Sequence, residues 1–283
     1  MALIGTLAFS GKAIIVKLAY RYGVDAVTLI MLRMLFALPV FVAMAWWASR
    51  GQMPLARNDW VGIFLLGFCG YYLASFLDFA GLAYISASLE RLILYLNPTI
   101  VVLLGLVLFK RRITGWQLLG MGISYLGVVV VFGHEITFQG KDAAWGALLV
   151  FLSAVSYALY LVYSGEMVKR LGSLRLVGLA STVACVLCLL QFLLLRPLSA
   201  AMVAPEVIWL SLLNASVCTV VPVLLIMMAI ERIGASLTAQ VGMLGTMSTI
   251  LMGVMVLGEP FTLWVAAGSA LVMAGIYIFS RAK

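Results

Sequence analysis

The sequence predicts an all-α integral membrane protein. Hydrophobic residues make up 65% of the 283 residues, charged residues only 10%, and the mean hydropathy is +1.18. A water-soluble domain could not keep so much apolar surface away from water. Apolar runs of about 20 residues, the length with which a helix crosses a hydrocarbon core of about 30 Å, recur along almost the whole chain. We therefore expect a protein that crosses the lipid bilayer many times.

Glycine, proline and charged residues separate ten apolar runs, and each run is predicted to be one transmembrane helix. In chain order the predicted spans are 2–20, 26–47, 60–82, 86–109, 115–133, 143–164, 173–195, 205–230, 235–257 and 262–280. The first run has no basic region before it and is interrupted by Lys12 and Lys17, so we expect a retained helix rather than a signal peptide. The sequence leaves open whether further residues precede it.

Basic residues are distributed unequally between the two sides of these spans. One side holds 3 of them, Arg21, Lys141 and Arg196, and the other side holds 11. The richer side contains Arg50, Arg57, Lys110, Arg111, Arg112, Lys169, Arg170, Arg175, Arg232, Arg281 and Lys283. Because lysine and arginine are enriched in cytoplasmic loops, we expect both termini in the cytoplasm. The short loops favour a bacterial plasma (inner) membrane.

Several classes of function are disfavoured by the sequence. The net charge of +8 lies mostly in short loops and forms no basic stripe with interleaved aromatics, so we expect no nucleic-acid partner. Cys185 and Cys188 have CxxC spacing without a second pair, which favours packing rather than metal binding. His134 is the single histidine, and neither GxSxG nor GxxxxGK[ST] occurs. We therefore expect no metal, no cofactor, no enzymatic activity and no ATP-driven transport.

The chain resembles itself at an offset of 148 positions. Ile85-Ser-Ala-Ser-Leu89 aligns with Ile233-Gly-Ala-Ser-Leu237, and the alignment continues without a gap to 11 identities over 43 positions. Each half holds five predicted spans, and because five is odd the second copy enters the membrane from the opposite side. The prediction is two inverted five-helix repeats, 1–135 and 143–283, an arrangement that transporters use. A duplication that only enlarged a scaffold is the alternative.

These motifs resemble a known family. Two five-span halves, each with an Ala-Ser-Leu span followed by a Thr-x-Trp, glycine-rich span, resemble the EamA type of the drug/metabolite transporter superfamily. Leu257-Gly-Glu-Pro260 before Thr262 is similar to that family's LGE-x-(x)-T turn, whereas Phe109-Lys-Arg-Arg112 departs from it. Lys17 and Arg33 also match family-typical positions. The resemblance covers nearly the whole chain and implies a ten-helix secondary carrier, often an exporter of amino acids or related metabolites.

Charged residues interrupt the spans of the first half, where each isolated charge at the bilayer centre costs about 2.5–3.5 kcal/mol. They are Lys12, Lys17, Arg33, Asp78, Glu90 and Arg91. On the predicted orientation all except the deeper Lys12 lie in the outer half of the membrane. We interpret them as the wall of a substrate pathway; the alternative is a structural ion-pair network, or snorkelling for Lys17. For Lys17 and Arg33 a structural or coupling role is favoured.

The fourth predicted span combines polar residues with a break. Glu90, Leu94 and Asn97 share one helical face, and Pro98 deprives the Leu94 carbonyl of its helical partner. Such a stripe is costly in lipid and useful in a cavity, although a plain proline kink satisfied by a neighbouring helix is the alternative.

The ninth predicted span is interrupted where the fourth is. Gly242 and Gly245 correspond to positions 94 and 97, and Gln240 supplies the only amide of this span. Paired broken spans point to a central binding site. Nearby aromatic residues, which could equally be packing or interfacial anchors, are predicted to line the route and suit a small amphipathic substrate such as an amino acid. They are Tyr72, Phe76, Tyr95 and Tyr157.

The function predicted from these features is alternating-access transport of a small molecule. A channel is disfavoured, because polar residues are concentrated in one half. A nucleotide-sugar or organophosphate exchanger and a multidrug exporter remain alternatives. Asp78 and Glu90 are the acidic candidates for proton coupling, and facilitated exchange without coupling is equally open. The sequence predicts no oligomeric state.

Overall fold

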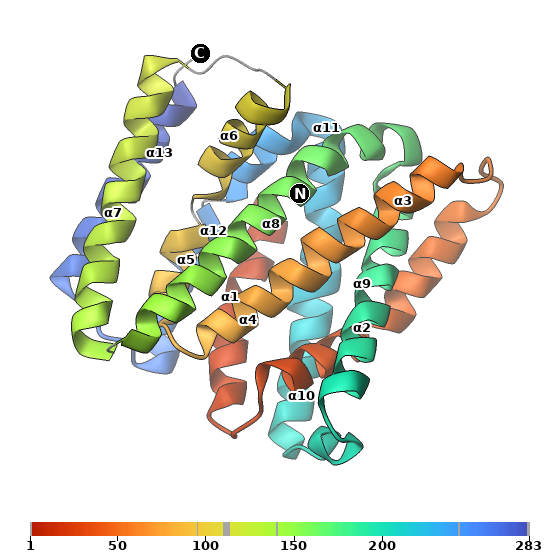
Figure 1. Ribbon diagram of the computed structural model, residues 1–283, viewed down its shortest axis with the longest axis horizontal. Coiled ribbons are helices and arrows are strands. Elements are labelled where there is room, and N and C mark those ends of the chain that lie inside the picture. The colour runs from red at the N-terminus through yellow and green to blue at the C-terminus, as the bar shows by residue number, and fades with distance from the viewer. Residues whose placement is uncertain (1, 95, 110–113, 140, 243, 282–283) are drawn as a thin grey trace.

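The computed structural model describes residues 2–94, 96–109, 114–139, 141–242 and 244–281, and these ranges are helical with short connections (Figure 1). No strand occurs within them. The expectation of an all-α protein is therefore confirmed for the described part of the chain.

The described residues of the first half form seven α-helices and one π-helical segment, η1. They are α1 (Ala2–Tyr20), α2 (Ala26–Ser49), α3 (Arg57–Leu66), η1 (Gly67–Leu73), α4 (Ala74–Leu82), α5 (Ala87–Leu94), α6 (Asn97–Phe109) and α7 (Gly115–Gln139). Because α3, η1 and α4 follow one another without a gap, they form one continuous span.

The second half follows a similar order. It contains α8 (Lys141–Leu171), α9 (Ser173–Leu195), the 3-10 turn η2 (Leu198–Ala201), α10 (Pro205–Ala215), the π-helical η3 (Ser216–Val220), α11 (Val221–Gly242), α12 (Leu244–Met252), the π-helical η4 (Gly253–Leu257) and α13 (Leu263–Arg281). Gly234 interrupts the helical conformation inside α11 with a φ of 81°, which costs glycine little because it has no Cβ.

Eight stretches within the described residues are long and apolar enough to cross a membrane, with mean hydropathies between 1.4 and 2.3. They are Leu3–Tyr20, Ala26–Ser49, Arg57–Leu82, Ala87–Leu106, Gly115–His134, Asp142–Leu171, Ser173–Leu195 and Pro205–Gly234. The last two of the ten predicted spans contain shorter apolar helices, Ser248–Leu257 and Leu263–Phe279. The protein is therefore a multi-pass membrane protein.

The helices pack in pairs around a central group (Figure 1). On one side of the bundle α7 lies against α13, and on the opposite side α2 lies against α9. Between these pairs α1 packs against α11, and α4 packs against α8. Small residues permit the closest approaches: a Cβ on Gly178 of α9 would lie 2.5 Å from the backbone nitrogen of Ala45 in α2.

The outer surface of the bundle is apolar. Trp47 is 76% exposed and Leu194 is 83% exposed, and many other large apolar side chains also lie on the outside. Water would make this surface unfavourable, whereas lipid tails accept it without cost.

Charged and polar contacts gather at the two ends of the helices. At one end Arg196 lies 3.2 Å from Asp25, the N-cap of α2, and Arg21 donates to the Leu257 carbonyl at 2.9 Å. At the other end Arg170 pairs with Asp59, and Arg175 donates to the Met53 carbonyl at 3.1 Å.

Candidate functional site

The break between α5 and α6 lies beside the cavity described below. Pro98 is the second residue of α6, a position where the missing N–H is not needed. The Leu96 N–H donates to the Ile93 carbonyl at 3.0 Å, and the Thr99 hydroxyl donates to the Leu96 carbonyl at 2.6 Å. The sequence predicted a kink that frees one carbonyl; the structure instead ends one helix and begins another.

A cavity of about 140 Å³ lies among α1, α2, η1, α4, α5, α6, α8, η3 and α11. One water molecule needs about 10–15 Å³ on this measure, so the cavity has room for a small organic molecule. The predicted site residues that line it are Lys12, Arg33, Asp78, Arg91, Leu94, Asn97, Pro98 and Tyr157.

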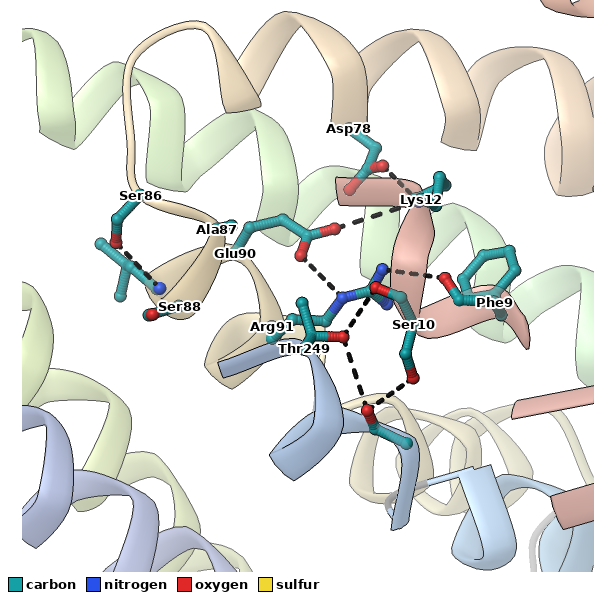
Figure 2. Close-up of polar contacts among 12 residues, drawn as sticks. Phe9, Ser10, Lys12, Asp78, Ser86, Ala87, Ser88, Glu90, Arg91 and Thr249 are labelled. Atoms are coloured by element: carbon teal, nitrogen blue, oxygen red, sulfur yellow. Dashed lines mark hydrogen bonds and ion pairs between the residues drawn. The ribbon is translucent and has the colours of Figure 1, made fainter. Parts of the chain in front are cut away.

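Two cations and two carboxylates form one buried network beside the cavity (Figure 2). The Nζ of Lys12 lies 2.5 Å from Oδ2 of Asp78 and 3.9 Å from Oε1 of Glu90. The other oxygen of Glu90 lies 3.1 Å from Nε of Arg91, in an ion pair that lacks hydrogen-bond geometry. Arg91 also donates to the Phe9 carbonyl at 3.3 Å. The chain itself thus balances the charges of Lys12 and Arg91.

Arg33 is a further cation in the cavity wall. It is 3% exposed, and its only hydrogen bond within the described residues runs to the Ser75 hydroxyl, at 2.8 Å. Its Cζ lies 4.7 Å from the centre of the Phe79 ring, which is a cation–π contact. A structural or coupling role was predicted for Arg33, and the structure positions its side chain in the cavity wall.

Aromatic rings form another part of the wall. Two cations contact the ring of Phe9: Nζ of Lys12 lies 4.7 Å and Cζ of Arg91 5.4 Å from the ring centroid. Tyr71 lines the cavity and shares a 2.5 Å hydrogen bond between hydroxyls with Tyr160.

Of the predicted polar face, Leu94 and Asn97 line the cavity, and Arg91 takes the place of Glu90. Arg91 and Leu94 line the cavity, whereas Glu90 is fully buried and points between α1 and its neighbour Arg91 (Figure 2). Glu90 therefore contributes through its two ion pairs rather than by facing the cavity. On α1, the predicted Lys12 is an ion-pair partner of Asp78.

Of the other predicted residues, Tyr72, Phe76 and Gly245 belong to the described part of the chain and do not line the cavity. The Tyr72 ring lies tilted against that of Phe68, with ring centroids 5.5 Å apart, and Phe76 is half-buried. Gly245 packs against α1 and accepts a 2.5 Å hydrogen bond from the Ser10 hydroxyl. Tyr95 and the side chains of positions 240 and 242 (Gln240 and Gly242) lie outside the described residues.

Several lining residues carried no distinct signal in the sequence. Phe9, Ser75 and Ser153 are isolated within apolar runs, so their periodicity does not separate them from packing residues. Tyr71 belongs to an aromatic cluster that the sequence does reveal, but which of its rings faces the cavity depends on the π-helical turn η1.

No group of three or more His, Cys, Asp or Glu side chains gathers at metal-binding distance within the described ranges. The buried Cys185 and Cys188 are free thiols, in agreement with the packing role predicted for them.

Comparison with known proteins agrees with this membrane architecture. A model of the EamA-like transporter family matches residues 1–133 and again 144–281. YcbK of Bacillus subtilis (strain 168), an uncharacterized transporter, is 31% identical over 272 residues, which are 91% of this chain and 84% of YcbK. An uncharacterized transporter of Archaeoglobus fulgidus is 23% identical over 96% of this chain and 93% of its own length.

A protein of known crystal structure shares the fold, with a TM-score of 0.72 at 18% sequence identity over 98% of this chain and 94% of that one. The family match spans both halves and thereby confirms the resemblance seen in the sequence motifs. The chain belongs to the EamA-like transporter family.

Proposed function

We propose that this protein is a secondary carrier that moves amino acids or their derivatives across the plasma membrane by alternating access. The main observation that supports this proposal is the cavity, which has buried charges on one part of its wall and aromatic rings on another. A cavity of this kind suits a small molecule with an apolar body and a charged end. Family membership supports transport as the general activity.

The distribution of charge favours a carrier over a channel. Among the described residues, the second half contributes polar but uncharged side chains to the lining: Ser153, Tyr157, Thr219 and Thr238. A channel needs polar groups along a continuous route through several spans. A cavity that is charged on one side is better suited to holding one solute during a conformational change.

An inverted repeat of ten helices completes the proposal. The offset of 148 positions relates the start of α3 at Arg57 to the start of α10 at Pro205. It also brings the π-helical η1 into register with η3, and the break after Leu94 into register with the end of α11 at Gly242. Equivalent breaks in both halves support a central site between two related modules.

Contacts between α7 and α13 support a two-fold relation between the modules. The offset maps Gly120 onto Gly268 and Gly127 onto Gly275. A Cβ on Gly120 would lie 2.5 Å from the carbonyl oxygen of Gly275, and one on Gly127 would lie 2.6 Å from that of Gly268. Each glycine thus meets the counterpart of the other, the contact pattern that a two-fold axis between the helices generates.

The proposed orientation has both termini in the cytoplasm. Arg170 and Arg175 lie at one end of the helices, and Arg21 and Arg196 lie at the other, which supports the division of basic residues read from the sequence. The end with more basic residues is proposed to be cytoplasmic. Reporter fusions after Lys169, Arg196 and the C-terminus test it: a C-terminus on the same side as Arg196 would refute both the orientation and the even number of spans.

Counterflow in vesicles tests the carrier itself. Purified protein is reconstituted with an unlabelled metabolite inside, and uptake of the same radiolabelled metabolite is followed for a panel of amino acids, acylated amino acids and sugar phosphates. A carrier accumulates label transiently against its gradient, because each inward step returns with an unlabelled molecule. Uptake that only equilibrates, with no overshoot, would indicate a channel.

A further inference from the structure

The charges around the cavity do not balance. Lys12 and Arg91 engage the carboxylates of Asp78 and Glu90 within the network defined above. Arg33 also lines the cavity, but no carboxylate of the described residues lies within ion-pair distance of its guanidinium. Three cations therefore stand against two anions, and the wall carries one excess positive charge.

Arg33 retains unused capacity for binding. A guanidinium has five N–H donors in a planar fork, and Arg33 uses one of them on Ser75 at 2.8 Å. Its Nε is buried and has no hydrogen-bond partner. A buried polar group without a partner is costly, and a buried charge without a counter-ion is more so. Contact with Phe79 relieves only part of that cost, since a cation–π contact does not occupy the N–H groups.

We propose that Arg33 binds the carboxylate of the transported substrate, and that the substrate carries a single net negative charge. The inference rests on the proposed function as a carrier. A guanidinium and a carboxylate match in a planar, two-point hydrogen-bonded pair. A monoanion neutralises the cavity, a zwitterion leaves one positive charge in it, and a phosphate dianion leaves one negative charge.

The rest of the wall specifies the other end of the molecule. Phe9, Tyr71 and Tyr157 present aromatic surface, and Leu94 is apolar. These groups suit an apolar or aromatic body but offer no second anion site, because Lys12 and Arg91 are already paired. The substrate class is therefore small monocarboxylates with an apolar body, such as the N-acylated or 2-oxo derivatives of apolar amino acids.

A probe set with one shared body and different charges tests this. N-Acetylphenylalanine and phenylpyruvate are monoanions, phenylalanine is a zwitterion, 2-phenylethylamine is a cation and benzyl phosphate is a dianion. Affinities are measured at pH 7.5 by calorimetry on the full chain in detergent. We expect the monoanions to bind at least about tenfold more tightly than the other three, the size of effect that a charge-assisted hydrogen bond supplies.

Variants assign the effect to Arg33. Arg33→Gln should weaken monoanion binding about tenfold or more without weakening 2-phenylethylamine, and Arg33→Lys should restore part of it. Ser75→Ala removes the hydrogen bond that orients Arg33 and should have a smaller effect in the same direction. Arg175→Gln is the matched control, because Arg175 is also buried but binds Ser49 and Met53 away from the cavity.

The outcomes separate the inference from the proposed function. Equal affinity for phenylalanine and the monoanions, no binding by any probe, or an unchanged monoanion affinity in folded Arg33→Gln would each overturn the inference. If Arg33→Gln does not fold, Ser75→Ala and Arg33→Lys decide by the same criterion. Counterflow of phenylalanine with no monoanion preference leaves the carrier standing and refutes the inference. Arg33-dependent monoanion binding without counterflow leaves the anion site at Arg33 standing and refutes the carrier, and with it transport of the bound anion.

Discussion

Ser124 in α7 donates a hydrogen bond to the main-chain carbonyl of Val272 in α13 at 3.4 Å, and the two residues are 148 positions apart. Residues related by the internal repeat thus touch each other directly. Gly120 and Gly127 lie about one helical turn before and after Ser124 in α7. Because they have no side chain, they permit the two backbones to approach closely.

Valine at Gly127 should destabilise the α7–α13 pair. A Cβ there would lie 2.6 Å from the Gly268 carbonyl, and backbone cannot move aside as a side chain does. Overpacking of this kind costs about 1–3 kcal/mol. Thermal unfolding in detergent measures it, with Gly122→Val as the control because nothing lies within 4 Å of its Cβ position. Equal melting temperatures of the two variants would contradict this packing.

Breaking the Lys12–Asp78 ion pair should cost more than removing both charges. Asp78→Asn leaves the ammonium of Lys12 buried with only Glu90, at 3.9 Å. Loss of one partner of a buried pair costs about 3–5 kcal/mol. The double variant Lys12→Met, Asp78→Asn should recover part of that stability in the same unfolding assay. Additive effects of the single substitutions would argue against a coupled pair.

Glu90→Gln should impair transport while leaving insertion into the membrane intact. Glutamine keeps the size of Glu90 but removes the negative charge between Lys12 and Arg91. Counterflow should slow by about tenfold or more, because an uncompensated buried charge costs several kcal/mol. Glu166→Gln is the control, since the Glu166–Lys169 pair is exposed. Wild-type counterflow by Glu90→Gln at every pH would remove Glu90 from the mechanism.

Glu259 should hold the first turn of α5. Its carboxylate accepts hydrogen bonds from the Ala87 N–H at 2.7 Å, the Ser88 N–H at 3.1 Å and the Ser88 hydroxyl at 2.6 Å. It therefore caps a helix of the other half of the chain, where anions are favoured. Glu259→Ala should cost about 0.5–2 kcal/mol and raise hydrogen exchange in that turn.

Glu206→Ala, at the exposed first turn of α10, is the control for this helix-capping effect. Unchanged exchange at positions 87–90 in Glu259→Ala would show that the capping contact does not stabilise α5.

Asp25 should make the stability of the fold depend on pH in the acidic range. Burial alone would raise the pKa of Asp25, but hydrogen bonds from Thr28 and the charge of Arg196 outweigh burial and hold the pKa below its usual value. A folded-state pKa below the unfolded value of about 3.9 stabilises the fold above about pH 4, and that stability is lost as the pH falls through the folded-state pKa.

Melting temperatures of the wild type and Asp25→Asn, compared from pH 3 to pH 7, measure this contribution. Asparagine still caps α2 but does not titrate, so the wild type should lose its advantage as the pH falls. A difference that stays constant across the range would assign the effect to capping alone.

The sequence alone determined that this protein lies in a lipid bilayer and where its helices are interrupted. Hydrocarbon demands long apolar helices, so the spans are visible as runs along the chain, and Asn97-Pro98 marks the start of α6 because proline lacks an N–H. The 148-position offset also survives in the sequence, since it compares residues of one chain without regard to distance in space.

Tertiary structure alone decided which charges are partners and which face the cavity. Lys12 of α1 pairs with Asp78 of α4, and Arg91 rather than Glu90 lines the cavity. Helical periodicity relates residues within one helix, whereas these choices depend on the rotation and depth of one helix relative to another. That geometry also leaves Arg33 without a carboxylate partner among the described residues, and a list of charged residues in the sequence does not contain this information.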